Sequence, residues 1–193
     1  MWNSLKEKQE EFKVEALVHM DSLYNAALKL THNPDDAKDL VQETYLKAFK
    51  FFEQFEPGTS CKAWLFKIQK NTFINKYRKK IKQPEHVDFD TVEPFVDLIK
   101  DKSSGEKRDI DEQIADRYLS DEINEALTKL PHDFKMVLLL SDMEGFSYKE
   151  IADIMECPIG TIRSRLSRAR KIMHKYLLKY SKEEGYYHEE VKK

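Results

Sequence analysis

The stretch that decides the fold is "SYKEIADIMECPIGTIRSRLSRARKIM", which runs from Ser147 to Met173. Its first four residues, Ser147 to Glu150, form the S-x-x-E pattern of a capping box, which predicts the start of a short helix. The helical pattern is interrupted before Pro158, where a second helix is expected to begin. Two short helices joined in this way predict a helix-turn-helix, whose second helix can enter the major groove of DNA.

The second helix of this motif has two contrasting faces. The inner face is expected to hold four apolar residues: Ile162, Leu166, Ala169 and Met173. The outer face then carries hydroxyls and guanidinium groups: Arg163, Ser164, Ser167, Arg168 and Arg170. An arginine on a guanine edge contributes about 1 to 3 kcal/mol of base discrimination, and its neighbours can bind phosphates. The pattern favours duplex DNA binding, and a helical hairpin that contacts another protein is the alternative.

A second basic stretch, "KAWLFKIQKNTFINKYRKKIK" at 62–82, contains eight Lys or Arg and no acidic residue. On a helix, three of its rings align on one face: Phe66, Phe73 and Tyr77. The opposite face groups an indole, an isoleucine and two amides: Trp64, Ile68, Asn71 and Asn75. Cations, exposed rings and amides together are typical of surfaces that bind unstacked nucleic acid. The alternative is that all four aromatic side chains belong to a core and the lysines only aid solubility.

The overall composition predicts a helical protein with strongly segregated charge. The chain has 193 residues, a net charge of −2, and only five glycines and six prolines for tight turns. Residues 83–126 contain 14 acidic and five basic residues, whereas residues 157–182 contain eight basic residues and no acidic one. We therefore predict a first domain at 10–82 and a second at 117–180, with an acidic flexible linker at 83–116 between them. The mixed-charge tail at 181–193 is expected to be disordered.

An acidic face is predicted on the helix that follows the sequence Asn33-Pro34. Asn33 is suited to cap this helix and Pro34 to occupy its first turn. The side chains of this face recur at helical spacing: Asp35, Asp36, Asp39, Gln42 and Glu43. The face is either a solvated surface or a docking surface for a basic partner.

The sequence contains no pattern of an assembled catalytic or metal site. Cys61 and Cys157 are far apart and without CxxC spacing, which argues against a disulfide framework and a zinc site. HExxH, P-loop and GxSxG motifs are missing, so no enzyme activity, cofactor or metal is expected. The charged amino terminus and the lack of a long apolar run predict a cytoplasmic protein without membrane insertion.

Three stretches in this order resemble one protein family. They are "NPDDAKDLVQETYLKAF" at 33–49, "CKAWLFKIQKNTFINKYRKK" at 61–80 and "EGFSYKEIADIMECPIGTIRSRLSRAR" at 144–170. They look like the region 2 and region 4 signatures of bacterial extracytoplasmic-function (ECF) sigma factors of RNA polymerase. The resemblance implies an all-α fold of two small helical domains, a region 2 bundle and a region 4 helix-turn-helix, joined by the acidic linker. A stand-alone helix-turn-helix transcriptional regulator is the alternative.

The resemblance also implies roles for individual residues and for partners. Binding of core RNA polymerase, through its β′ clamp helices, falls on Asp35, Asp36, Asp39, Gln42 and Glu43, and the β flap is a second polymerase contact. Binding of the melted minus-10 promoter strand falls on Phe55, Lys62, Trp64, Lys67, Lys70, Asn71, Asn75 and Arg78. Binding of the minus-35 duplex falls on Thr161, Arg163, Ser164, Arg165, Ser167 and Arg168. Ser167 departs from the larger aromatic or histidine that relatives often carry there.

A narrower likeness concerns regulation. The stretches at 57–80 and 144–155 resemble the ECF subgroup that responds to thiol-oxidative stress. Members of that subgroup are held inactive by a small zinc-binding anti-sigma factor. The likeness therefore implies a stress-response regulon, an anti-sigma partner that senses the redox state, and no sensing role for Cys61 or Cys157.

Overall fold

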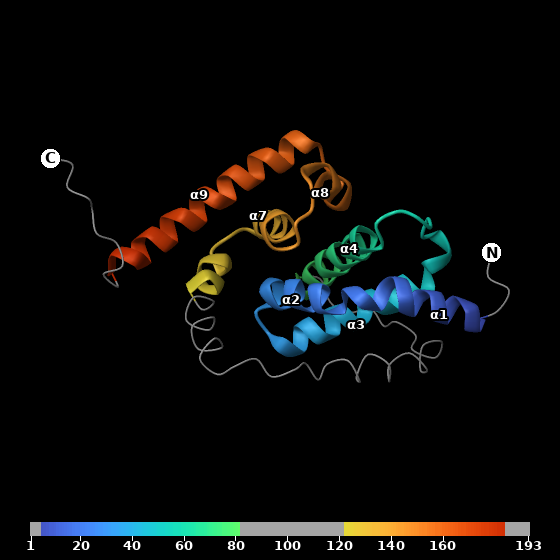
Figure 1. The fold of residues 1–193 in the computed structure, drawn as a ribbon. Helices are drawn as coiled ribbons and strands as arrows, with labels where there is room; N and C mark the ends of the chain where they lie inside the picture. Colours follow the sequence, from blue (N-terminus) through green and yellow to red (C-terminus); the bar gives the residue numbers. More distant parts are fainter. Residues whose placement is uncertain (1–4, 82–121, 184–193) are drawn as a thin grey trace, which may run out of the picture. The chain divides into compact units, whose positions relative to one another are not determined.

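The computed structural model describes residues 5–81 and 122–183, and every element in these ranges is helical (Figure 1). The first range contains α1 (Leu5–Ala16), η1 (Leu17–His19), α2 (Met20–Thr31), α3 (Pro34–Lys50), η2 (Phe52–Gln54) and α4 (Cys61–Ile81). The second contains a helix at 122–128, α7 (His132–Leu138), η3 (Leu139–Met143), α8 (Tyr148–Met155) and α9 (Ile159–Glu183). The predicted all-α class is confirmed for the described part of the chain.

The chain divides into two compact units, and each is described here by itself. The first unit contains α1 to α4, and the second contains α7, η3 and α9. The predicted linker at 83–116 lies outside the described residues. The predicted tail begins at residue 181, but α9 continues to Glu183; the remainder of the tail lies outside the described residues.

The first turn of α3 forms as the sequence predicts. The Asn33 side chain accepts hydrogen bonds from the backbone N–H groups of Asp35 and Asp36, at 2.9 and 3.0 Å, and Pro34 occupies the first helical position. These bonds satisfy two of the amide groups that a helix start leaves without a partner. The start of the acidic helix is therefore fixed by local contacts.

The core of the first unit is built around Phe12 on α1. Its ring is fully buried and meets Tyr45, Phe49 and Phe52 edge to face, with ring centroids 6.2, 5.3 and 5.0 Å apart. The Tyr45 hydroxyl donates to the Ala16 carbonyl oxygen at 3.0 Å, so its buried polar atom is satisfied. Helix α3 packs against both α2 and α4 and so joins the bundle together.

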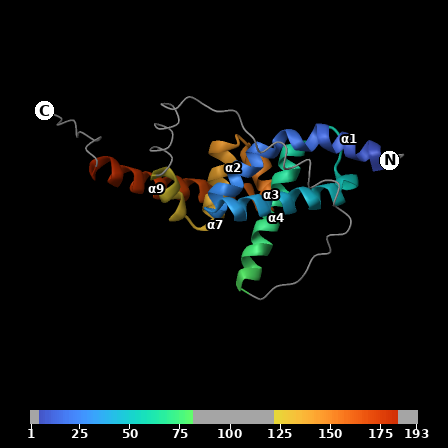
Figure 2. The same cartoon turned by 90° about the horizontal axis from the view of Figure 1, so that it is seen from below.

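Helix α4 runs in a different direction from the other helices of its unit. Figure 2 shows α4 crossing α3 steeply, with its carboxyl-terminal part extending beyond α1, α2 and α3. The hydroxyl oxygen of Ser60 accepts a hydrogen bond from the Ala63 N–H at 3.2 Å and so caps the start of this helix.

The predicted helix-turn-helix elements, α8 and α9, are both present. Ser147 and Glu150 form the reciprocal bonds of a capping box, with Ser147 N–H to Glu150 Oε2 at 2.8 Å and Glu150 N–H to Ser147 Oγ at 3.3 Å. Gly145 has φ +74°, a left-handed conformation that glycine adopts without steric cost, and ends the preceding helical segment. Glu156, in the turn between α8 and α9, also lies in this region, with φ 55°.

The apolar face of α9 is buried as predicted. Helix α9 packs against α7, and Ile162, Leu166, Ala169 and Met173 are all buried. None of the helices in the described part of the chain is sufficiently long and apolar to cross a membrane.

The Phe12→Ala variant tests the aromatic core of the first unit. Removal of a fully buried phenyl ring should lower the free energy of unfolding by about 3 to 5 kcal/mol. Val14→Ala on the same helix is the matched control, because Val14 is 69% exposed and its truncation should cost within about 0.5 kcal/mol. Urea unfolding followed by Trp64 fluorescence measures both, and equal effects of the two substitutions would contradict the assigned core.

Candidate nucleic-acid interface

The outer face of α9 is an exposed surface of hydroxyl and guanidinium groups. Arg163, Ser164, Ser167 and Arg168 are exposed, while Thr161 is half-buried. The Ser164 hydroxyl donates to the Thr161 carbonyl oxygen at 2.9 Å, as hydroxyls within helices often do. Within the described residues, Arg163 and Arg168 form no ion pair, so their charges are available to phosphates or base edges.

Two other arginines of α9 are engaged within the second unit. Arg165, which the resemblance places among the minus-35 residues, is half-buried and forms a 2.6 Å ion pair with Asp133 of α7. Arg170, expected on the outer face, bonds to Asp142 of η3 at 2.6 Å. Sequence reasoning missed both aspartates, because Asp142 and Arg170 are 28 residues apart and no local period links them.

Helix α4 separates a core face from an amide-bearing face. Phe66 is buried and Phe73 is half-buried, whereas Asn71 and Asn75 on the opposite face are exposed. The side chains of Tyr77 and Arg78 lie outside the described residues. The buried face also contains the polar residues Gln69 and Thr72, which the hydrophobic pattern missed. Gln69 Nε2 donates to the Leu23 carbonyl oxygen at 2.8 Å.

An aromatic cluster lies beside the amino-terminal part of α4. Phe55 is buried and stacks on Phe52 with centroids 5.7 Å apart and planes 10° from parallel. The half-buried Trp64 tilts against both rings, at 5.4 Å from Phe55 and 6.2 Å from Phe52. The structure therefore brings together Phe55 and Trp64, which the resemblance assigns to minus-10 binding, but it buries the Phe55 ring.

The predicted minus-10 lysines all belong to α4. Lys62, Lys67 and Lys70 fall in its first ten residues, upstream of Asn71. Lys62 Nζ lies 5.9 Å from the centre of the Phe66 ring, within the range of a cation–π contact. Lys62 and Lys67 are half-buried, whereas Lys70 is buried at 3% exposed, which differs from its predicted place at a DNA-binding surface. The exposed amide of Asn71 and two partly exposed cations therefore occupy one helix, a combination that suits binding to a single strand.

The acidic face of α3 is exposed at its start and engaged further on. Asp35, Asp36 and Asp39 are exposed, and Gln42 is half-buried. Glu43 instead links α3 to α4, because its carboxylate pairs with Lys47 at 2.7 Å and with Lys76 at 3.1 Å. Burial by itself raises the pKa of Glu43, but the hydrogen bonds from these two lysines outweigh it and the pKa is lowered.

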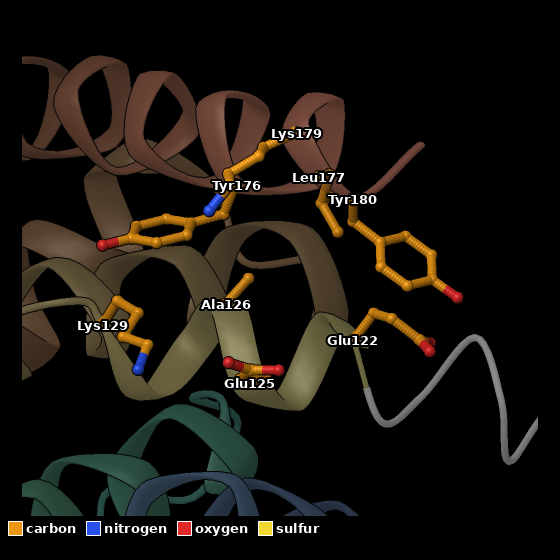
Figure 3. A pocket seen from close by; sticks show the side chains of 8 residues that line it. All are labelled: Glu122, Glu125, Ala126, Lys129, Tyr176, Leu177, Lys179 and Tyr180. Atoms are coloured by element: carbon orange, nitrogen blue, oxygen red, sulfur yellow. The ribbon is translucent and has the colours of Figure 1, made fainter. Parts of the chain in front are cut away.

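A groove lies elsewhere in the second unit, between the helix at 122–128 and the carboxyl-terminal part of α9. Figure 3 shows Tyr180 of α9 above Glu122 of the shorter helix, and Tyr176 above Ala126 and Lys129. None of the residues assigned to DNA lines this groove. In the described residues, no group of three or more His, Cys, Asp or Glu is arranged to hold a metal ion.

The two cysteines have different environments. Cys61 begins α4 and is 5% exposed; burial raises its pKa to about 12, and the charge of Glu15 adds to the effect. Cys157 precedes α9, is half-buried and lies 3.9 Å from Nη1 of Arg165. A buried thiol with a raised pKa is a poor nucleophile, since the thiolate is the reactive form.

The comparisons with known proteins match both halves of this interface. The Sigma-70 region 2 family model matches residues 17–82, and the Sigma-70 region 4 model matches residues 120–173. The first match covers the acidic helix and α4, and the second covers α7 to the first part of α9. The chain is therefore a protein of the sigma-70 class, which associates with RNA polymerase and is not a class of enzymes.

Two relatives identify the family within this class to which the chain belongs. The chain is 35% identical over 161 residues to the ECF RNA polymerase sigma factor EcfG of Rhodopseudomonas palustris, covering 83% of this chain and 82% of the relative. It is 33% identical over 170 residues to the ECF RNA polymerase sigma factor SigE of Mycolicibacterium smegmatis, covering 86% of this chain but 61% of the relative. The chain belongs to the ECF family of sigma factors.

A solved structure agrees with this assignment. The sigma factor RpoE from Bartonella quintana, crystallised with the anti-sigma factor NepR, is similar with a TM-score of 0.65 and 31% sequence identity. The similarity covers 87% of this chain and 97% of that one. A stand-alone helix-turn-helix regulator accounts for α8 and α9 but leaves the region 2 match unexplained.

Thiol labelling tests the different environments of the two cysteines. A pKa of about 12 leaves Cys61 with on the order of 1,000-fold less thiolate than an ordinary cysteine, so Cys157 should react first with iodoacetamide at pH 8. Cys61 should react at a comparable rate only in urea. Intact-mass spectrometry of Cys61→Ala and Cys157→Ala follows each thiol separately, and fast labelling of native Cys61 would contradict its assigned environment.

Proposed function

We propose that this chain binds core RNA polymerase, directs it to specific promoters and initiates transcription. Helix α9 reads the minus-35 element as duplex, and α4 with the aromatic cluster binds the melted minus-10 strand. The observation that carries the proposal is the presence of two lysine- and arginine-rich helices, α4 and α9, within region 2 and region 4 matches that follow in order. The working domains are 10–82 and 117–180, with 83–116 as linker.

Strand opening follows from preferential binding. A base that leaves the DNA stack costs a few kcal/mol, which stacking and pocket contacts can offset. Asn71 supplies an exposed amide for a base edge, and the half-buried Trp64, which packs beside the buried Phe55, supplies a ring for stacking. Because these groups bind the open form better than the duplex, they shift the equilibrium towards melting without a catalytic step.

The acidic start of α3 is the proposed contact with the β′ clamp helices of core polymerase. Asp35, Asp36 and Asp39 are exposed and lie near the start of one helix, where a basic partner can reach all three. Glu43 is half-buried and already paired with two lysines, so its part in this contact is to hold α3 against α4. The β flap is the proposed second polymerase contact, through region 4.

Regulation by an anti-sigma factor is the second part of the proposal. The related RpoE structure contains the anti-sigma factor NepR, which supports a partner of this type. The likeness at 57–80 and 144–155 favours a zinc-binding anti-sigma factor and a thiol-oxidative stress regulon. Burial of Cys61 supports sensing by the partner rather than by this thiol. The protein then acts in the cytoplasm, where promoter DNA and polymerase are located.

A reconstitution tests the main proposal. The chain is mixed with sigma-free core polymerase and a library of genomic fragments, and permanganate then maps unpaired thymines in the bound DNA. Open complexes and transcripts are expected only when chain and core are combined. No open complex on any fragment would overturn the proposal, and tight duplex binding without polymerase would favour the stand-alone regulator.

The Asn71→Ala variant separates strand opening from duplex binding. Loss of the exposed amide should reduce open complexes about tenfold, the size of one lost base contact, while closed complexes at low temperature change little. Asn25→Ala on α2 is the matched control, because Asn25 is also an exposed helical asparagine. Permanganate reactivity and electrophoretic mobility measure the two states, and equal loss of both would contradict the role of Asn71.

The double variant Asp35→Asn, Asp39→Asn tests the polymerase contact. Removal of two exposed charges should weaken binding of core polymerase about tenfold at low salt and less at high salt, because exposed charges are screened. Asp21→Asn on α2 removes an exposed charge outside the acidic face and should leave binding unchanged. Fluorescence titration with labelled core measures both, and unchanged affinity of the double variant would argue against this contact.

A further inference from the structure

Two arginines lie on opposite flanks of the buried face of α9. At 100° per residue, Arg165 and Arg170 are each about 70° from the direction in which Ile162, Leu166, Ala169 and Met173 point, on opposite sides. Each is held by an aspartate from the α7–η3 segment, Arg165 by Asp133 and Arg170 by Asp142. Helix α9 is therefore held by an ion pair on each side of its buried face.

The two pairs differ in geometry. Arg165 Nη2 lies 2.6 Å from Asp133 Oδ2. Arg170 forms a two-point contact, with Nη2 to Asp142 Oδ1 at 2.6 Å and Nε to Asp142 Oδ2 at 3.2 Å, and Nη2 also donates to Ser141 Oγ at 3.3 Å. Such bidentate pairs fix orientation as well as distance. The hydrogen bond from Arg170 lowers the pKa of Asp142, against the opposing effect of burial.

The apolar face alone defines the rotation of α9 poorly. Apolar burial is non-directional, and Ala169 at the centre of the buried face has only a methyl group to interlock with α7. A roll of about 20° about the helix axis moves a side-chain end by about 2 Å at the about 6 Å radius of a helix with side chains. A shift of that size breaks a hydrogen bond to a base edge.

We propose that the Asp133–Arg165 and Asp142–Arg170 pairs form a clamp that sets the rotation of α9, so that Arg163, Ser167 and Arg168 meet the minus-35 bases in a defined orientation. The four clamp residues are positioning residues, and Arg165 acts from the flank rather than by reading bases. The inference rests on the proposed reading of duplex DNA by α9.

A purely electrostatic role for the two aspartates predicts a different change in DNA binding. If the aspartates acted only as charges near DNA, their neutralisation would strengthen binding to every duplex equally, because phosphate contacts carry no sequence information. The clamp predicts instead that neutralisation lowers the preference for one sequence while general affinity stays the same or rises. Both pairs are open to solvent on at least the aspartate side, and such ion pairs contribute little to folding, so the variants should remain folded.

The experiment uses the full-length chain bound to core polymerase and a pool of duplexes with a randomised minus-35 region. Bound duplexes are sequenced at low temperature, and preference is the enrichment of the best wild-type sequence over the pool mean. For Asp133→Asn, Asp142→Asn the preference should fall about tenfold, the size of one lost base contact. Arg170→Lys should cause a similar loss although it keeps the charge, because lysine lacks the two-point fork.

Controls separate the clamp from charge and from folding. Asp142→Glu keeps the carboxylate and should restore most of the preference that Asp142→Asn loses. Asp153→Asn removes an exposed carboxylate of α8 and should keep the wild-type preference. Thermal unfolding by circular dichroism should be close to wild type for all variants. Arg163→Ala should lose preference whether or not the clamp exists.

The possible outcomes distinguish failure of the clamp from failure of duplex reading by α9. Unchanged preference in both the double aspartate variant and Arg170→Lys, with Arg163→Ala impaired, would overturn the clamp and leave duplex reading intact. A wild-type chain that enriches no minus-35 sequence would overturn duplex reading and the clamp with it. Loss of preference in the aspartate variants with a matching loss in Asp153→Asn would show that the effect does not depend on the two ion pairs, and would overturn the clamp.

Discussion

The burial of one apolar face of α9 is the interaction on which the DNA-binding unit depends. Ile162, Leu166 and Ala169 have almost no exposed surface and pack the helix against its own unit. Because a helix has a 3.6-residue period, the same spacing that buries these side chains places Arg163, Ser167 and Arg168 in solvent. The same periodicity thus determines which side chains hold α9 in its unit and which side chains it exposes, and neither set can change without the other.

Helix α4 also buries one face and exposes the other, but its buried face is more polar. Gln69 and Thr72 are buried, and their neighbour Lys76 reaches Glu43 of α3. Hydrogen bonds such as that from Gln69 to the Leu23 carbonyl replace part of the apolar packing. A helix that keeps two amides in solvent and several of its lysines partly exposed, while it crosses α3 steeply, has few positions left for large apolar residues (Figure 2).

Local features of this fold could be predicted from the sequence, whereas the long-range polar contacts could not. The Asn33 cap, the Ser147–Glu150 capping box and the apolar face of α9 all follow from neighbouring residues, and all are present. The burial of Phe55 and the pairing of Arg165 with Asp133 depend on how distant segments meet. Periodicity places a side chain on a face of its helix, but it does not say which segment that face meets.

The ion pairs also change how much of the basic charge of α9 is left unpaired. Residues 157–182 contain eight basic residues and no acidic one, which suggests a continuous cationic surface. Aspartates from an earlier part of the same unit neutralise Arg165 and Arg170, which lie nearest the core, and leave Arg163 and Arg168 unpaired within the described residues. General attraction to phosphates grows with every unpaired cation, whereas discrimination between bases needs few contacts in fixed positions. Pairing the flanking arginines within the unit therefore lowers the general attraction to phosphates. Discrimination between bases is left to the side chains that face outward.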